Sequence, residues 1–285
     1  MRCIVAGLIA ATGLCGQQPD MPELLQALAR TASFFSRTSP SLTAHEVLEQ
    51  RARRGNMRVL RRGRHDELKE VAFTIPDTFE QHIVISDYRL GTPREGGFHE
   101  IRDIRSIDGQ PPAAVRHAMT IGAETAEDES KKRLLEDLEL ERLQGAATDF
   151  GPLLLLFGEG RQSNMRFTVP LRKAAESGAV WVLSYRQADG EGGLTEFRNS
   201  REKRHAAEGQ IWFRETDLLP LHITMNTEEA LTSKFSLRNE AAIDYQPTPY
   251  GLAPRMVVHR QYLNQDLLVE NRFLYSDYGG LEIIP

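Results

Sequence analysis

The clearest alternation of apolar and polar residues lies in residues 209–245 and predicts consecutive β-strands. In the pentad Leu-His-Ile-Thr-Met at residues 221–225, the three apolar side chains fall on one face and the two polar ones on the other, which is the two-residue period of a half-buried strand. An apolar strand at residues 210–214 precedes it across a polar turn at 215–220, and the apolar residues along 235–243 predict a third strand. The pattern therefore indicates an antiparallel sheet.

Shorter patterns of the same kind predict more strands on both sides of this stretch, at residues 42–52, 68–75, 79–88, 98–107, 165–169, 180–185, 256–262 and 270–278. The strand at 180–185 is apolar on both faces, which predicts a central position in the sheet. Residues 190–193 are glycine-rich and residues 199–208 are highly charged, so both are expected to be loops, the second one mobile. Strands in sequence order with short turns between them predict an antiparallel meander.

Two helices are expected beside the strands. Residues 22–36 carry apolar side chains at three- and four-residue spacing, with Pro22 near the start. Residues 125–144 hold the longest helical pattern, and the acidic residues at its start and Gly145 at its end suit a helix. Both helices are expected to pack on one face of a curved antiparallel sheet, which makes the fold class α+β.

Residues 153–157 form an uninterrupted apolar run bracketed by Gly151-Pro152 and Gly158. Because five large apolar side chains exposed to water favour aggregation, the run is expected to be buried as a short helix or turn. It can complete a core, or it can act as a lid over a ligand cavity. The predicted apolar site, made of the run and the strand residues expected to face it, comprises Leu153, Leu154, Leu155, Leu156, Phe157, Phe167, Trp181, Leu183, Ile211 and Phe213.

The first residues have the pattern of a secretory signal peptide. Arg2 supplies a positive charge, residues 3–14 form an apolar run too short to span a bilayer, and small residues up to Gly16 suit cleavage. A buried N-terminal helix is the alternative interpretation. Lipid attachment at Cys15 is disfavoured because the bulky Leu14 precedes it. The protein is therefore expected to be periplasmic or secreted.

Composition narrows the class of function further. The chain has 285 residues, of which 40% are hydrophobic and 26% charged, and a net charge of -5. It can bury a sizeable core, and it is a poor candidate for binding nucleic acid. Both cysteines lie in the predicted signal peptide, so the mature chain would have no disulfide, zinc thiolate or cysteine nucleophile. We expect one domain at residues 17–285 with a helical insertion at about 125–157, and no transmembrane segment in it.

The sequence contains no recognisable catalytic or metal-binding signature. The eight histidines do not fall at the spacing of a His-Glu-x-x-His motif, and no Gly-x-Ser-x-Gly segment occurs. The glycine-rich segments at 158–160 and 190–193 lack the lysine of a phosphate-binding loop. Trp181 and Trp212 lie in predicted strands and are expected in the core, with the wall of a ligand cavity as the alternative. We predict a protein with no catalytic site, cofactor or metal.

Four segments resemble the periplasmic lipoprotein-carrier superfamily, the LolA, LolB and RseB type. They are a Leu-Leu-x-x-Leu helix ending in aromatic residues (24–35), a Gly-x-Ile-Trp-Phe strand with a Glu-Thr-x-x-Leu-Pro turn (209–223), a Leu-x-Pro strand opening (252–262) and a strand ending in Tyr-Ser-Asp-Tyr (273–278). The resemblance implies a curved, unclosed antiparallel barrel with helices on its concave face, where the carriers bind acyl chains. Residues 150–157 with the strand at 165–167 also resemble exported bacterial proteins of this type that have no established function.

Three functions remain open at the level of sequence. The leading hypothesis is an exported, non-catalytic protein of the bacterial envelope that binds an apolar ligand or acyl chain. The second is an envelope-stress or assembly module that binds protein partners, as the RseB-type relatives do. The third is a hydrolase of unknown substrate. Co-purifying lipid would favour the first hypothesis, and cleavage of ester, phosphate or glycoside reporters would favour the third.

Overall fold

The computed structural model describes residues 18–53, 56–58, 72–74, 77–90, 100–111, 150–175, 178–188, 194–198, 201–231 and 233–280. Several sequence predictions lie outside these ranges: the signal peptide, most of the strand at 68–75, the loop at 190–193 and the helix at 125–144. The described residues include the apolar segment at 153–157 and all of its predicted partners on the strands.

Strands dominate this part of the chain, as the alternation predicts. The strands are β1 (Leu42–Ala52), β2 (Asn56–Arg58), β3 (Ala72–Thr74), β4 (Glu80–Leu90), β5 (Glu100–Ile107), β6 (Met165–Phe167), β7 (Leu171–Ala175), β8 (Gly178–Gln187), β9 (Leu194–Arg198), β10 (Arg201–His205), β11 (Glu208–Arg214), β12 (Pro220–Ala230), β13 (Ser236–Thr248), β14 (Gly251–Leu263) and β15 (Asp266–Gly280). The helical elements are α1 (Met21–Thr38) and the 3-10 helices η1 (Ser39–Ser41), η2 (Gly151–Phe157) and η3 (Glu159–Asn164).

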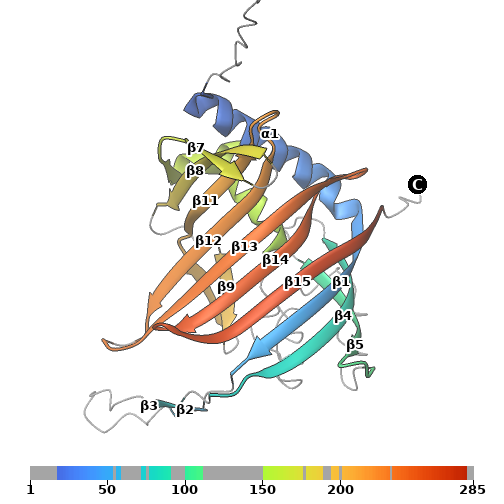
Figure 1. Cartoon of the computed structure of the whole chain (residues 1–285), viewed down its shortest axis with the longest axis vertical. Coiled ribbons are helices and arrows are strands. Elements are labelled where there is room, and N and C mark those ends of the chain that lie inside the picture. Colours follow the sequence, from blue (N-terminus) through green and yellow to red (C-terminus); the bar gives the residue numbers. More distant parts are fainter. Residues whose placement is uncertain are drawn as a thin grey trace, which may run out of the picture.

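Most strands belong to one large antiparallel sheet, which Figure 1 shows as a broad twisted surface. Its order is β5-β4-β1-β15-β14-β13-β12-β11-β8-β6, with β7 also paired to β8. Strands β11 to β15 follow one another as the predicted meander. Strand β1 pairs with β15, so the first and the last of the described strands are neighbours in the sheet. The described strands leave the sheet unclosed, with β5 at one end and β6 and β7 at the other. Two short hairpins, β2 with β3 and β9 with β10, stand outside it.

The two faces of the large sheet differ in burial. Along β1 the burial alternates residue by residue, and the face that carries Ala44 and Leu48 packs in one apolar cluster with α1 and η2. We call this the inner face and the opposite one the outer face. Helix α1 begins at its N-cap Asp20, whose carboxylate accepts a hydrogen bond from the Glu23 amide at 2.8 Å. Its apolar stripe, with Leu28 at its centre, is buried in the same cluster.

Two sequence predictions about strands are wrong. Residues 180–185 lie in β8, which is close to one end of the sheet and not at its centre. Their outer-face residue Val182 is buried because its register partners are Leu171 on one side and Trp212 on the other. The predicted mobile loop at 199–208 contains β10, which pairs with β9 in a hairpin. The charged sequence predicts a loop because it lacks the alternating apolar residues by which a strand is recognised.

Candidate functional site

The apolar run at residues 153–157 is a short helix, as predicted, and forms most of the 3-10 helix η2. Phe150 and Gly151-Pro152 lead into it, and Gly158 ends it. A 3-10 turn of this length satisfies few of its own backbone groups. The side chains of the sheet therefore have to supply part of its hydrogen bonding, and two of them do so.

The structure brings the predicted apolar site residues into one cluster. Leu154, Phe157, Leu183, Ile211 and Phe213 have no exposed surface. Among the predicted site residues, Leu153, Leu156 and Trp181 are also buried in this cluster, while Leu155 and Phe167 are partly buried and pack against it. The apolar run thus belongs to the same apolar cluster as inner-face residues of β8 and β11.

Contact between η2 and the sheet is also aromatic. The Phe157 and Tyr185 rings meet edge to face with centroids 4.8 Å apart. Trp212, in contrast, corrects the prediction of a core tryptophan. It is half-buried and lies on the outer face, where it stacks on His222 with centroids 4.7 Å apart. The alternation along β11 places Trp181's register partner Phe213 inside and its neighbour Trp212 outside.

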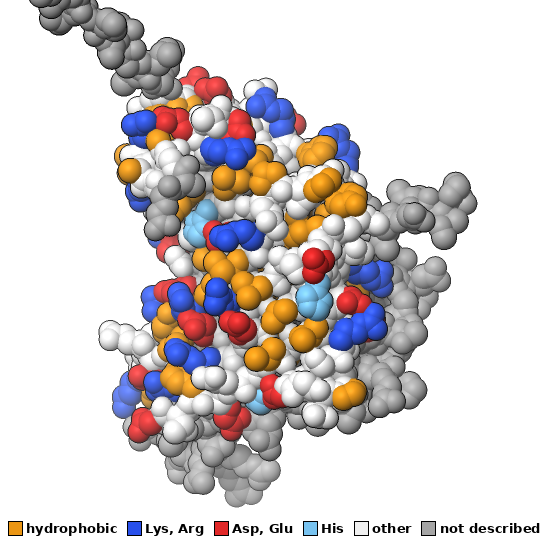
Figure 2. Space-filling view, turned by 45° about the vertical axis from the view of Figure 1, so that its right-hand side comes forward, with side chains coloured by type: hydrophobic (Ala, Val, Ile, Leu, Met, Phe, Trp, Pro, Cys, Tyr) orange, Lys and Arg blue, Asp and Glu red, His pale blue; other side chains and the backbone are white. Residues whose placement is uncertain are grey.

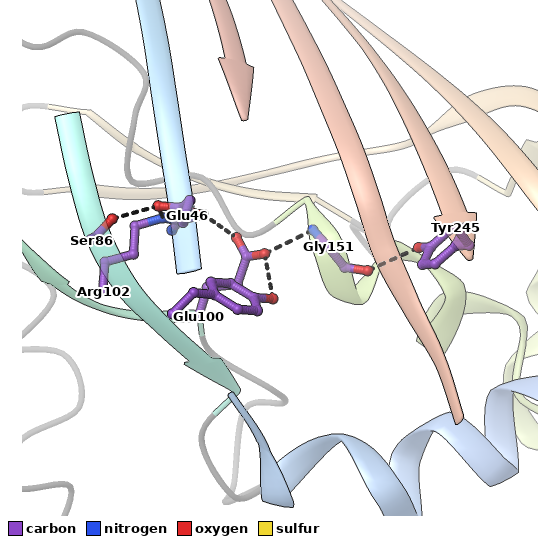
Figure 3. Close-up of polar contacts among 7 residues, drawn as sticks. Glu46, Ser86, Glu100, Arg102, Gly151 and Tyr245 are labelled. Carbon is purple, nitrogen blue, oxygen red and sulfur yellow. Dashed lines mark hydrogen bonds and ion pairs between the residues drawn. The ribbon is translucent and has the colours of Figure 1, made fainter. Parts of the chain in front are cut away.

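Side chains of the sheet anchor η2 at its first residue, Gly151. The Gly151 amide donates to Oε1 of Glu100 at 3.0 Å, and the Gly151 carbonyl accepts from the Tyr245 hydroxyl at 2.9 Å. The same hydroxyl accepts from the Leu154 amide at 3.2 Å. A Cβ atom at Gly151 would lie 2.4 Å from Oε1 of Glu100 and 2.9 Å from the Tyr88 hydroxyl, so only glycine fits. Figure 3 shows this chain of contacts running from the sheet into η2.

Behind this anchor lies a buried ionic cluster on β1 and β5. Arg102 donates through Nε to both carboxylate oxygens of Glu46, at 2.9 and 3.0 Å, and through Nη2 to Glu100 at 2.9 Å. Glu46 is 1% exposed and Arg102 6% exposed. The Ser86 hydroxyl donates to Glu46 at 2.8 Å and the Tyr88 hydroxyl to Glu100 at 3.0 Å. Two carboxyl groups therefore share one guanidinium, and neutral donors complete their hydrogen bonds (Figure 3).

The electrostatics of the cluster follow from its burial. Burial alone would lower the pKa of the Arg102 guanidinium, but the charges of Glu46 and Glu100 outweigh it and hold that pKa well above its ordinary value. Burial, reinforced by the charge of Glu100, raises the pKa of Tyr88 well above its ordinary value. Arg102 also lies over the Phe273 ring, 5.0 Å from its centroid. Arg102 therefore keeps its positive charge, and it depends on complete pairing inside the protein.

The sequence reasoning missed this cluster, although a signal for it exists. In the segment Ala44-His45-Glu46-Val47-Leu48, the two-residue period places Glu46 on the same face as Ala44 and Leu48. A carboxylate among inward-facing apolar residues needs a partner. That partner, Arg102, is 56 residues away in the chain, and only the pairing of β1 with β4 and of β4 with β5 brings it near.

A second polar group crosses the inner face as a row of hydrogen-bonded side chains on five strands. The donors all point the same way: Gln50 to Asn271 at 2.6 Å, Asn271 to His259 at 3.4 Å, His259 to Asn239 at 3.2 Å and Asn239 to Thr227 at 3.5 Å. All five residues are buried, and His259 stacks on Phe150, the residue before η2, with centroids 4.6 Å apart. Polar side chains thus continue across the sheet from the ionic cluster.

The neighbours of His259 fix its protonation. Nε2 faces the Asn239 carbonyl oxygen, which can only accept, so Nε2 carries the hydrogen. Nδ1 faces the Asn271 amide nitrogen and therefore accepts. A second proton on Nδ1 would place two donors against each other. Burial of the ring also lowers the pKa of His259 to about 4 from 6.5.

We expect His259 to make the protein less stable in mild acid. Because the folded-state pKa is depressed, its stabilising contribution is complete above pH 6.5 and is lost as the pH falls toward 4. A shift of this size corresponds to roughly 3 kcal/mol in the free energy of unfolding. The free energy of unfolding, measured with urea at several pH values in this range, should fall less steeply with decreasing pH in His259→Gln than in the unmodified protein. Equal slopes in the two proteins would show that His259 titrates freely.

A His-Asp pair, with the residue types of acid-base chemistry, lies on the outer face. His222 Nδ1 and Asp244 Oδ1 are 2.6 Å apart, and Arg255 donates to the other Asp244 oxygen at 2.9 Å. Burial raises the pKa of Asp244, but the hydrogen bond and charge of His222 together with Arg255 lower it by more. Trp212 covers the other side of His222. The register partner of His222 on β11 is thus an aromatic ring.

No protein family model, no curated protein and no solved structure matches this chain. Within the residues that the structure describes, no group of three or more His, Cys, Asp or Glu side chains is arranged to hold a metal ion. Among those same residues, no helix is both long and apolar enough to cross a bilayer. The inner face and η2 are the features of the described structure that bear on function.

Proposed function

We propose that this protein binds an apolar ligand or acyl chain against the inner face of its unclosed sheet, at the place that η2 occupies. The observation that carries the proposal is the way η2 is held. It is an apolar segment that pairs with no strand, and its first residue is attached by the side chains of Glu100 and Tyr245. A segment held in this way can leave without breaking any strand pairing of the sheet.

The chemistry of the position suits an apolar chain. When η2 leaves, it takes Phe157 away from Tyr185 of β8 and opens the apolar cluster that also holds Leu183, Ile211 and Phe213. The hydroxyl of Tyr245 and the carboxylate of Glu100 would then lie at one end of the apolar surface. Apolar walls with a few convergent polar groups are typical of sites for small molecules. Because η2 fills this position in the free protein, we call it the plug.

The same arrangement supports the finer fold that we propose, a curved, unclosed barrel of the lipoprotein-carrier type with helices on its concave face. The open antiparallel sheet, the leading helix α1 and the plug beside it agree with that fold. In this proposal the protein belongs to the bacterial envelope and handles lipid or lipidated molecules. The family resemblance and the apolar inner face support it together.

Titration with a fluorescent fatty acid tests the proposal. Leu154→Ala removes buried contacts of the plug, so the ligand-competent form becomes more populated and apparent affinity rises by about tenfold or more. Leu155→Ala, at a half-buried neighbour, should raise it less. Val269→Ala is a destabilising control, because Val269 is fully buried outside the cluster that holds the plug.

The outcome is read from affinity and melting temperature together. Val269→Ala should lower the melting temperature without changing uptake, while Leu154→Ala should change both. If Leu154→Ala lowers the melting temperature and leaves uptake unchanged, η2 only completes a core, and a protein that binds partners through other surfaces becomes the better account.

A further inference from the structure

A separate feature lies where α1 meets the turn between β13 and β14. Phe34 on α1 is 46% exposed and Tyr250 in the turn is 40% exposed. Gly251, at φ 119°, follows Tyr250 and lies against Phe34, because a Cβ atom there would lie only 2.8 Å from the Phe34 ring. In Figure 1 the turn, the end of β15 and the C-terminal half of α1 come together at the upper right.

Two prolines and two arginines extend this feature. Pro247 at the end of β13 and Pro249 in the turn are exposed. Arg30 and Arg37 are also exposed, and the spacing Arg30, Phe34, Arg37 places all three on one side of α1. Figure 2 shows hydrophobic side chains beside basic ones at this end of the molecule. The end patch is defined as Arg30, Phe34, Arg37, Pro247, Pro249 and Tyr250.

Several exposed arginines of the sheet pair with carboxylates, as Arg105 does with Asp87 and Arg260 with Glu270. In the described part of the chain, neither Arg30 nor Arg37 forms an ion pair. Their charge is therefore available to a partner, on a chain whose net charge is -5.

We propose that the end patch docks on an anionic lipid surface. Tyrosine has an apolar ring and a polar hydroxyl and favours the boundary between lipid headgroups and acyl chains, and phenylalanine can insert its apolar ring there. Arginine can reach the phosphates while its stem stays in contact with apolar groups. Each basic residue near an anionic surface contributes about 1 kcal/mol, so two of them give weak, reversible and salt-dependent binding. The patch favours an anionic lipid surface because it combines unpaired positive charge with exposed aromatic rings.

The patch lies one residue away from the plug's anchor. Phe34 points outward, while the next residue, Phe35, is buried and meets the Tyr245 ring edge to face at 6.3 Å. Tyr245 holds Gly151 and Leu154 of the plug. A membrane at the end patch would therefore lie close to the anchor of the plug, where an acyl chain is proposed to bind. Docking itself does not require that the inner face bind lipid, so the two proposals can fail separately.

Co-sedimentation with vesicles tests the docking. The full chain should sediment with vesicles of phosphatidylglycerol and phosphatidylcholine in equal parts at low salt. It should not do so with phosphatidylcholine alone, and high salt should release it. Replacing both arginines, Arg30→Gln with Arg37→Gln, should lower the partition coefficient about 25-fold, from about fivefold for each. Phe34→Ser with Tyr250→Ser should lower it several-fold.

Matched controls distinguish binding by the end patch from a general effect of net charge or of exposed apolar surface. Arg105→Gln changes net charge at another exposed arginine, and Ile83→Ser removes an apolar side chain that is 52% exposed. Both should sediment like the unmodified protein. The double arginine variant still tests the proposal if the double aromatic variant fails to fold, because Arg30 and Arg37 are exposed and their replacement should leave the fold intact. The proposal is overturned by absent sedimentation with phosphatidylglycerol, by equal sedimentation with phosphatidylcholine, or by equal losses in Arg105→Gln and the arginine pair. Fatty acid uptake in solution, without vesicles, should be unchanged in the arginine pair.

Discussion

Arg102→Met is expected to lower the free energy of unfolding by about 3–5 kcal/mol, because it leaves two buried carboxyl groups without their shared cation. Glu46 and Glu100 both lie within hydrogen-bonding distance of Arg102, and all three are buried. Methionine fills a similar volume, so the loss reports the missing charge more than a cavity. Urea or guanidinium unfolding at neutral pH measures it.

Two further proteins make this result interpretable. Arg105→Met breaks an ion pair between Arg105, on the exposed side of β5, and Asp87 of β4, and should cost far less because that pair is exposed to solvent. Adding Glu46→Gln and Glu100→Gln to Arg102→Met removes the unpaired charges and should restore much of the stability. A loss in Arg102→Met no larger than that in Arg105→Met would contradict the assignment of a buried ionic cluster.

Leu154→Asp is expected to lower the free energy of unfolding by at least ~3 kcal/mol. Leu154 has no exposed surface and lies among apolar side chains, so an aspartate there loses its contact with water without gaining a partner. Leu155→Asp is the matched control, because Leu155 is half-buried and its replacement can turn toward solvent. The difference between these neighbours is measured by thermal or urea unfolding.

The plug proposal adds a limit to this effect. Once η2 has left the sheet, a charge on it costs nothing further, so the loss cannot exceed the free energy that docks the plug. The strands should keep their antiparallel structure in Leu154→Asp, visible by circular dichroism. Equal losses in Leu154→Asp and Leu155→Asp would mean that the two leucines do not differ in burial as described.

The sequence predicts most of the strands because burial on one face imposes a two-residue period. Residues 221–225 are recognised in this way, and they lie in β12. The order of strands carries no such local signal. The strand at 180–185 is apolar on both faces because Leu171 and Trp212 flank its outer side, and not because it is central.

The candidate site divides in the same way. The apolar run that forms the plug is recognised because it is continuous and bracketed by glycines. The groups that hold it, Glu100 and Tyr245, are separated from Gly151 by 51 and 94 residues. A partner at such a distance is selected by sheet register, which pairs β4 with β5 and β13 with β14. Local pattern therefore finds the apolar surface but not the polar anchor.

The most direct test of the plug is amide hydrogen exchange at residues 151–157 with and without the fluorescent fatty acid. In the free protein, the Gly151 and Leu154 amides donate to Glu100 and Tyr245 and should be protected. The plug proposal predicts that bound ligand displaces η2, so these two amides exchange faster while the amides of β13 and β14 stay protected. If the ligand binds and the Gly151 and Leu154 amides keep or gain protection, the ligand does not take the place of η2 and the central claim is wrong.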